Sequence, residues 1–157
     1  MKNVFLMIVN IILISIFNVL FRFFNVSNDL NILNNNSSVI GSYLTSSNVD
    51  VPYLNIFIFS FVLTFILFFL IIFILKKTTN YSFLSVISKL KNLYIFIFIL
   101  VSILLLYFNT IIAFAVLIIG FILFVFFIYK EFNINNYFYL ICLIFILYFL
   151  AFYFISF

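Results

Sequence analysis

The sequence predicts an all-α, polytopic transmembrane protein in which residues 1–157 form a single integral membrane domain. Hydrophobic residues make up 69% of the chain and charged residues only 6%, so a soluble domain of this length could not cover its apolar surface. The stretch from Leu93 to Tyr129 contains no charged side chain. Because one helix of that length would be nearly twice as long as the roughly 30 Å of hydrocarbon in a bilayer, this stretch must fold back on itself inside a membrane.

The first predicted span covers residues 4–24, an apolar segment that contains a few polar side chains and is long enough to cross a bilayer. A signal peptide is the alternative, because Lys2 precedes the segment. The apolar part is longer than the usual signal-peptide core of about 7 to 15 residues, and no small-residue cleavage pattern follows it. Residues 25–52 are rich in Asn, Ser, Thr and Asp without a helical period, which predicts a polar extramembrane loop.

The second predicted span covers residues 53–75. Pro52 precedes it, where a missing N–H is harmless, and two lysines follow it. In residues 78–92, apolar side chains recur at helical spacing between serines and lysines, which predicts a short helix lying in the membrane interface. An irregular basic loop is the alternative for this segment. The apolar positions of the predicted helix are Phe83, Leu84, Ile87 and Leu90.

The long apolar run is predicted to reverse at Asn109 and Thr110, because both side chains tolerate a tight turn by bonding to nearby backbone groups. This break divides the run into spans at residues 93–108 and 111–129. A polar linker follows, and the fifth predicted span covers residues 137–157.

A five-span model places every lysine on one side of the membrane. Lys2 precedes the first span, and the other lysines follow the second span, lie in the predicted interfacial helix or follow the fourth span. In the five-span model all of these positions lie on the same side as Lys2, in agreement with the rule that basic loops share one side. Arg22 is the exception, at a position where its long side chain can reach the headgroups. A four-span model, with residues 93–129 as one tilted helix, would put Lys130 on the opposite side.

The composition excludes several kinds of chemistry. The chain has no His, one cysteine and two methionines, so Cys/His metal clusters, intrachain disulfides and haem held by two histidines are not available. An ion-translocating subunit normally keeps an acidic or basic side chain at mid-membrane, and no predicted span has one there. Seven basic residues are too few for a nucleic-acid surface. The sequence therefore predicts no catalytic residue, no metal site and no cofactor.

Five residues are candidates for contacts with lipid or with the helices of a partner. Asn10 and Asn18 lie in the first span, where amides seek hydrogen-bond partners, and Arg22 lies near the end of that span. Ala113 and Gly120 share one face of the fourth span, as small residues do where helices approach closely. Two interpretations stay open for the amides: a hydrogen-bonding seam against a neighbouring subunit, or packing within this chain.

Phe, Ile, Asn and Tyr dominate the chain while Gly, Pro and Trp are scarce, a bias typical of proteins encoded by A+T-rich DNA. No Arg-rich amphipathic import signal precedes the first span. In composition, over its whole length, the chain resembles the mitochondrially encoded hydrophobic subunits of respiratory-chain complexes. Five spans at this length are also similar to the small membrane subunit six of NADH:ubiquinone oxidoreductase (complex I), although the Gly-rich, Tyr-containing third helix of that family has no counterpart here.

The resemblance implies a structural or divergent membrane subunit of a mitochondrial respiratory-chain assembly, with the membrane arm of complex I as the first expectation. The amino terminus would lie on the matrix side of the inner membrane. The partners would be the lipid bilayer and other transmembrane subunits, and not nucleic acid. The alternative class is a small bacterial or secretory-pathway transporter, or an accessory membrane subunit of one. The location of the gene separates the two classes.

Overall fold

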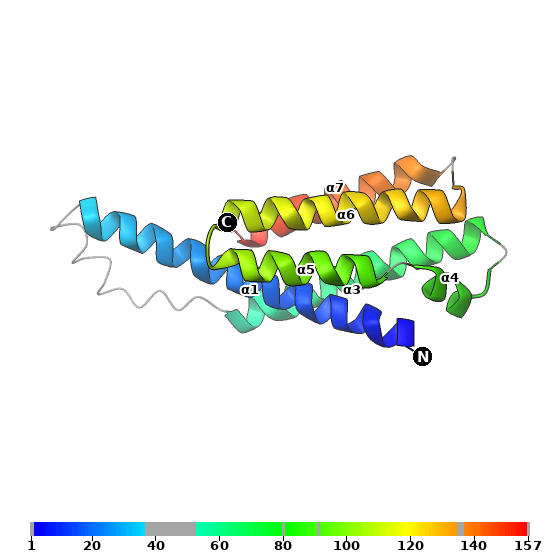
Figure 1. Ribbon diagram of the computed structural model, residues 1–157, viewed down its shortest axis with the longest axis horizontal. Helices are drawn as coiled ribbons and strands as arrows, with labels where there is room; N and C mark the ends of the chain where they lie inside the picture. The colour runs from blue at the N-terminus through cyan, green and yellow to red at the C-terminus, as the bar shows by residue number, and fades with distance from the viewer. Residues whose placement is uncertain (1, 37–52, 80, 91, 135–136, 157) are drawn as a thin grey trace.

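The computed structural model describes residues 2–36, 53–79, 81–90, 92–134 and 137–156. Over these residues all regular structure is helical and forms six helices (Figure 1). The predicted all-α class is confirmed. The bounds of the helices are α1 Lys2–Asn36, α3 Tyr53–Thr78, α4 Phe83–Lys89, α5 Asn92–Leu106, α6 Thr110–Phe132 and α7 Phe138–Ser156.

Three helical segments of the described chain are long and apolar enough to cross a membrane: Asn3–Asn25 of α1, the whole of α3 and the whole of α6. A fourth candidate exists if α4 and α5, which meet at a bend of 53°, form one span together. The apolar part of α7, Phe138–Ala151, is shorter than these. The lengths and hydropathy of the helices therefore define an integral membrane protein with three to four candidate spans, and the count of five remains a prediction.

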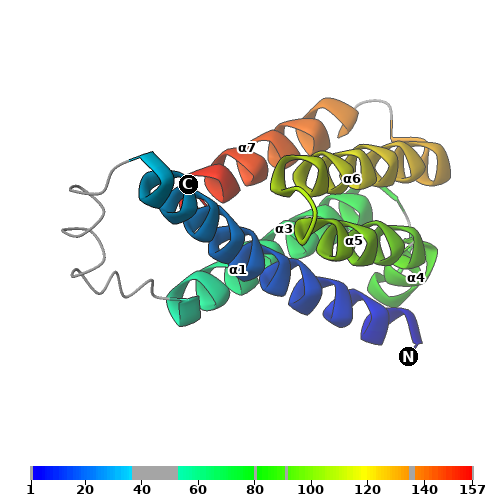
Figure 2. The same cartoon turned by 60° about the vertical axis from the view of Figure 1, so that its left-hand side comes forward.

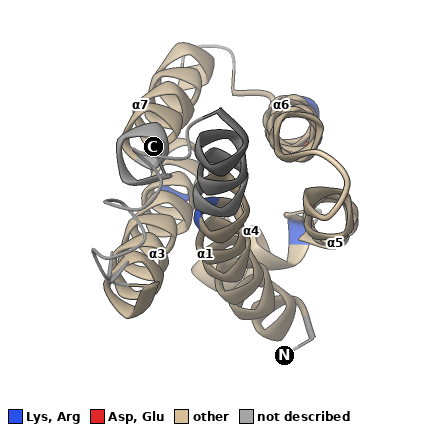
Figure 3. Cartoon of the chain, turned by 90° about the vertical axis from the view of Figure 1, so that its left-hand side faces the viewer, with Lys and Arg blue, Asp and Glu red and all other residues tan. Residues whose placement is uncertain are grey.

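Helix α1 lies in the middle of the bundle, with α3 and α7 on one side and α5 and α6 on the other (Figures 2 and 3). It packs mainly against α3 and α5, while α5 and α6 pack along each other as an antiparallel hairpin. Aromatic rings fill much of the interior: Phe68 of α3 meets Phe124 of α6 at 6.0 Å between ring centroids, and Phe21 of α1 meets Phe114 of α6 at 5.4 Å. These contacts join helices that are far apart in the sequence.

The reversal predicted at Asn109 and Thr110 is present. Helix α5 ends at Leu106, α6 begins at Thr110, and Asn109 caps the new helix. The side-chain Oδ1 of Asn109 accepts hydrogen bonds from the backbone N–H groups of Ile111 at 2.9 Å and Ile112 at 3.1 Å. These are two of the donors that a helix start leaves unpaired. The single tilted helix of the four-span alternative is therefore not what the chain forms.

Replacement of Asn109 by Ala is expected to lower the free energy of unfolding by about 1 kcal/mol, because two backbone donors lose their acceptor. Thermal melting of the purified chain in detergent, followed by circular dichroism, measures the change. Asn109→Asp keeps a capping oxygen and serves as the control. Equal melting temperatures for the Ala and Asp variants would contradict a capping role for this side chain.

Two segments differ from the sequence prediction in length. Helix α1 continues to Asn36, so residues 25–36 are helical, although a loop was predicted over residues 25–52; the remainder of that loop lies outside the described residues. A helix that has already nucleated adds further turns at little cost, even through residues of modest propensity. Helix α6 likewise runs to Phe132, so that Lys130 lies in its last turn and not in a linker.

The short helix predicted within residues 78–92 is present as α4, with a different buried face. Ser82 caps it by accepting a hydrogen bond from the backbone N–H of Ser85. The residues that it buries are Val86 and Ile87, with Leu90 directly after its end, while Phe83 and Leu84 of the predicted stripe are exposed. The sharp bend into α5 rotates α4 relative to its neighbours, and this rotation is not visible in the spacing of its apolar residues.

The described lysines gather at one end of the bundle. The start of α1, the end of α3, all of α4 and the end of α6 lie at this end (Figure 1), which we call the lysine end. It carries two lysines in the last turn of α3, one at the end of α4 and one in the last turn of α6. The ammonium of Lys89 lies 3.6 Å from the centre of the Tyr81 ring, in a cation–π contact. The turn between α5 and α6 lies at the opposite end of the bundle.

Candidate functional site

Three polar side chains of α1, those of Asn10, Ser15 and Asn18, are buried inside the bundle, and several polar side chains of this helix hydrogen-bond within the chain. Asn3 donates from Nδ2 to the backbone carbonyl of Ser88 at 2.9 Å, and Asn10 donates to the carbonyl of Asn92 at 2.9 Å. Asn92 returns a longer bond of 3.4 Å from Nδ2 to the carbonyl of Asn3. We call Asn3, Asn10 and Asn92 the amide clasp. It connects α1 to the junction between α4 and α5.

The amide clasp fixes the bend between α4 and α5. Ser88 lies in the last turn of α4, where carbonyl groups have no partner within the helix, and Asn3 supplies one. Asn92 opens α5, and its own backbone N–H bonds back to the carbonyl of Leu90 at 2.8 Å. Asn3 and Asn10 reach both sides of the bend because residues seven apart share one helix face. The clasp therefore positions the start of α5 against α1.

A second group of polar contacts lies deeper in the bundle and joins α1, α3 and α7. Asn18 of α1 donates to the hydroxyl of Ser60 on α3, and both side chains are buried. One turn further along α3, the hydroxyl of Thr64 lies 3.0 Å from the hydroxyl of Tyr148 on α7, also buried. These side chains are amides and hydroxyls. They can hold helices together by hydrogen bonds in a medium where water is scarce.

Three amide oxygens of this polar interior have no hydrogen-bond partner among the described residues: Oδ1 of Asn10, of Asn18 and of Asn92. A buried acceptor left without a donor costs about 1–3 kcal/mol. Each of these amides donates a hydrogen bond inside the bundle from its NH₂ group. Its oxygen can still accept a hydrogen bond from a further donor. A carboxamide does not ionise, so these oxygens can accept a hydrogen bond but cannot carry a proton through the membrane.

Of the two interpretations left open for Asn10 and Asn18, the structure favours packing within the chain, because both amides are buried between helices of this chain and bond to it. Arg22 lies one turn after Asn18 and is partly exposed, near the end of the segment Asn3–Asn25. Its position agrees with a side chain that reaches toward the headgroups.

Ala113 and Gly120 are also buried within the bundle that this chain forms. Both are buried on α6, and a Cβ atom on Gly120 would lie 2.6 Å from Cβ of Phe98 on α5. The close approach that small residues permit is therefore an approach of α6 to α5 in this chain. At Gly120 the helix that approaches belongs to the same hairpin, and a contact of these two residues with a partner or with lipid stays a prediction.

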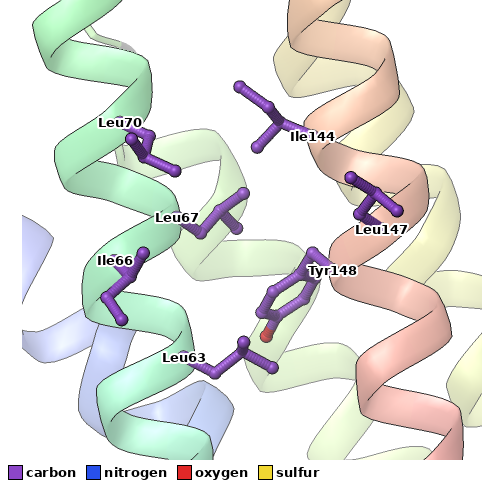
Figure 4. Close-up of a pocket in the computed structure, with 7 residues that line it drawn as sticks. All are labelled: Leu63, Ile66, Leu67, Leu70, Ile144, Leu147 and Tyr148. Carbon is purple, nitrogen blue, oxygen red and sulfur yellow. The ribbon is translucent and has the colours of Figure 1, made fainter.

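Two apolar hollows open on the flanks of α7. One, of about 180 Å³, lies between α3 and α7 and is lined by leucine and isoleucine side chains (Figure 4). The Tyr148 ring forms one wall of this hollow, with its hydroxyl directed toward Leu63 (Figure 4). The other, of about 390 Å³, lies between α6 and α7 and includes Cys142, a free, half-buried cysteine. The apolar side chains that line both hollows favour contact with apolar groups.

The sequence did not predict that a polar interior includes Asn92, Ser60, Thr64 and Tyr148. For Asn92 a signal exists, since it is an amide at the start of an apolar run. In the part of the chain that the structure describes, no three His, Cys, Asp or Glu side chains lie close enough to hold a metal ion. The site is thus a neutral polar interior in a bundle of apolar helices.

Comparison with models of known protein families, with curated proteins and with solved structures finds no match for this chain. The class defined by its fold and site is a small helical integral membrane protein whose interior is joined by amide and hydroxyl hydrogen bonds.

Proposed function

We propose that this chain is a structural membrane subunit of a respiratory-chain assembly in the mitochondrial inner membrane, within the membrane arm of complex I. The observation that carries the structural role is the chemistry of the interior: the polar side chains that join α1, α3, α5 and α7 are neutral amides and hydroxyls. A subunit that moved protons would need a group that takes up and releases them at mid-membrane. The Phe-, Ile- and Asn-rich composition supports the mitochondrial assignment.

We further propose that the chain crosses the membrane five times with its amino terminus on the matrix side. Support comes from the alternating directions of α1, α3, α5, α6 and α7 (Figure 1) and from the gathering of lysines at one end. The basic end of a membrane protein faces the compartment in which positive charge is retained. The lysine end would therefore face the matrix, and Asn109 the opposite compartment.

The five-span topology predicts which positions an impermeant thiol reagent reaches. In a variant with Cys142 replaced by Ser, a cysteine at Asn109 is expected to be labelled from the same side as one at Ser37, because both would follow an odd-numbered span. A cysteine at exposed Glu131 should be labelled from the other side. Labelling of the Asn109 and Ser37 cysteines from opposite faces would exclude this topology.

The assignment to a respiratory assembly predicts co-migration. An antibody raised against residues 37–50 should detect the chain in a native gel at the position of the membrane-bound NADH dehydrogenase activity, after mild detergent extraction. A gene in the organellar genome, read with a reassigned code, would agree with this result. Migration near the 18.6 kDa of the single chain, or with a transport complex, would instead favour the small-transporter class.

The structural role predicts how the assembly responds to loss of the one charge near the end of the first span. Arg22→Gln keeps hydrogen bonding and removes the charge, so assembly is expected to weaken by about 1 kcal/mol, with turnover per assembled complex unchanged. Native-gel abundance and NADH oxidation per complex measure the two quantities separately. Normal assembly with a collapse of turnover would mean that Arg22 takes part in the reaction, and the structural role would then be wrong.

A further inference from the structure

The lysine end carries most of the charged residues that the structure describes. Lys2 opens α1 there, and four more lysines lie at the end of α3, at the end of α4 and in the last turn of α6. Glu131 is the one acidic residue among the described residues at this end. Toward the opposite end, the described residues include Arg22 and Asp29 of α1, whose charges have opposite signs. The two ends of the bundle therefore differ in net charge.

The lysines of α3 and α6 lie where these two candidate spans end. At 1.5 Å per residue, residues 53–75 of α3 extend over about 35 Å and residues 110–129 of α6 over about 30 Å. These lengths match the roughly 30 Å of hydrocarbon in a bilayer. Lys76, Lys77 and Lys130 follow directly, and all three are exposed. The lengths of the two spans therefore place these ammonium groups at the level of the lipid headgroups.

An exposed phenylalanine lies one turn before the lysines on each of these helices. Phe73 precedes Lys76 by three residues and Phe126 precedes Lys130 by four, so each pair shares one face of its helix. The two phenylalanines are 54% and 56% exposed. Each face is thus apolar toward the membrane centre and positively charged at the boundary. A phospholipid has the matching order of acyl chain and phosphate, whereas an acidic loop of another protein would meet the lysines and leave the rings uncovered.

Exposed tyrosines surround the same end of the bundle. Tyrosine gathers at the membrane–water interface because its ring is apolar and its hydroxyl is polar. The exposed tyrosines at the lysine end are Tyr81, Tyr94, Tyr129, Tyr137 and Tyr139. The Tyr81 ring, which holds the ammonium of Lys89, also meets the Phe132 ring of α6 at 6.2 Å. A cation–π contact leaves the ammonium charged, so Lys89 adds a positive charge that is held in place at the boundary.

We propose that the lysine end is an interaction surface for anionic phospholipids. Its exposed lysines attract negatively charged headgroups into the adjoining leaflet in preference to zwitterionic ones, while the exposed rings below them contact the acyl chains. Several lipids around the bundle take part, because the lysines lie on different helices. This inference rests on the membrane location of the helices and not on the respiratory assignment, so either can fail without the other.

Tryptophan fluorescence tests the proposal, because the natural chain contains no tryptophan. Tyr137→Trp places a reporter at the lysine end, and Tyr107→Trp places the control in the turn between α5 and α6 at the opposite end. Both positions are exposed. Each variant is reconstituted in phosphatidylcholine vesicles that contain a small fraction of phosphatidylglycerol with brominated acyl chains. Both leaflets contain the brominated lipid, so the direction in which the chain inserts does not affect the result.

The quantity compared is the quenching of Tyr137→Trp divided by that of Tyr107→Trp. Brominated phosphatidylcholine gives the value of this ratio that depends only on how well each ring meets acyl chains. With brominated phosphatidylglycerol the ratio is expected to be at least about twofold higher, because surface lysines attract anionic lipid. High salt should reduce the difference, since it screens exposed charges. Equal ratios for the two lipids would overturn the proposal and would favour an acidic partner protein at the lysines.

Charge variants at exposed positions of the lysine end test the cause of the preference. Combining Lys76→Gln, Lys77→Gln and Lys130→Gln should remove most of the excess quenching by phosphatidylglycerol. Glu131→Gln, which removes the opposing charge at an exposed position of the same end, should increase the excess, and Lys130→Arg should leave it unchanged. If the triple variant kept the full excess, or if Glu131→Gln lowered it, the charge of the lysine end would not select the lipid and the proposal would be wrong.

Discussion

Replacement of Gly120 by Val is expected to destabilise the protein by about 3 kcal/mol, at the upper end of the usual cost of overpacking. Even the first added carbon would lie 2.6 Å from Cβ and 2.8 Å from Cγ of Phe98, and Cβ of Phe98 cannot rotate away from its helix. The hairpin of α5 and α6 must therefore open by about 1 Å or more, which separates the two helices with the most extensive contact in the described bundle. Thermal or denaturant unfolding of the purified chain in detergent measures the loss.

Ala115 provides the matched control, because it lies on the same helix and is exposed. Ala115→Val introduces the same β-branched side chain into α6 without a neighbouring backbone in the way, so only a few tenths of a kcal/mol are expected from helix propensity. If the Gly120 and Ala115 variants unfold at the same denaturant concentration, the close contact between α5 and α6 does not exist as described.

Removal of both α1 amides of the clasp is expected to loosen α4 more than any other part of the chain. In the double variant Asn3→Ala, Asn10→Ala, two hydrogen bonds to the α4–α5 junction are lost, each with a value of about 0.6–1 kcal/mol in a membrane protein. If both contribute to holding α4 in place, its backbone amides should exchange with solvent roughly tenfold faster. Hydrogen exchange read by mass spectrometry on peptides that cover residues 81–92 measures this.

Asn18→Ala is the control for the clasp. Asn18 is an amide of the same helix, but it donates its hydrogen bond to Ser60 on α3 and not to the junction. Exchange in residues 81–92 should stay at the natural rate in this variant. Equally fast exchange in the control and in the double variant would show that α4 responds to general loosening of α1 and not to the clasp.

The sequence predicted those parts of the fold that local chemistry determines. The break at Asn109 follows from the limited thickness of a bilayer and from an amide that can cap a helix, and both are visible within a few residues. The start of α3 at Tyr53 agrees with the span predicted from residue 53, directly after a proline in the sequence. The buried face of α4 was not predictable, because the bend that sets it depends on amides of α1 more than eighty residues earlier.

For the candidate site, too, the sequence predicted which residues share a helix face but not which helix they contact. The spacing of Asn3 and Asn10 places them on one face of a helix, and the small residues Ala113 and Gly120 indicate a close approach. Neither pattern states which helix lies opposite. In a membrane, a partner helix in the same chain and one in another subunit present the same apolar surface, so composition cannot distinguish them. The Thr64–Tyr148 pair left no pattern at all, since each is a single polar residue in an apolar run.

The bond from Asn10 to Asn92 also imposes an order on biosynthesis. The two residues are 82 positions apart, and the chain grows from its amino terminus. When α1 has been made, the acceptor of its amide does not yet exist, and the hairpin of α5 and α6 is still to be translated. While α3 is synthesised, the Asn10 side chain therefore lacks its native acceptor and lies among lipids or in the insertion machinery. A ribosome that stalls between these two segments would leave a nascent chain with an exposed amide in hydrocarbon, which quality-control proteases can recognise.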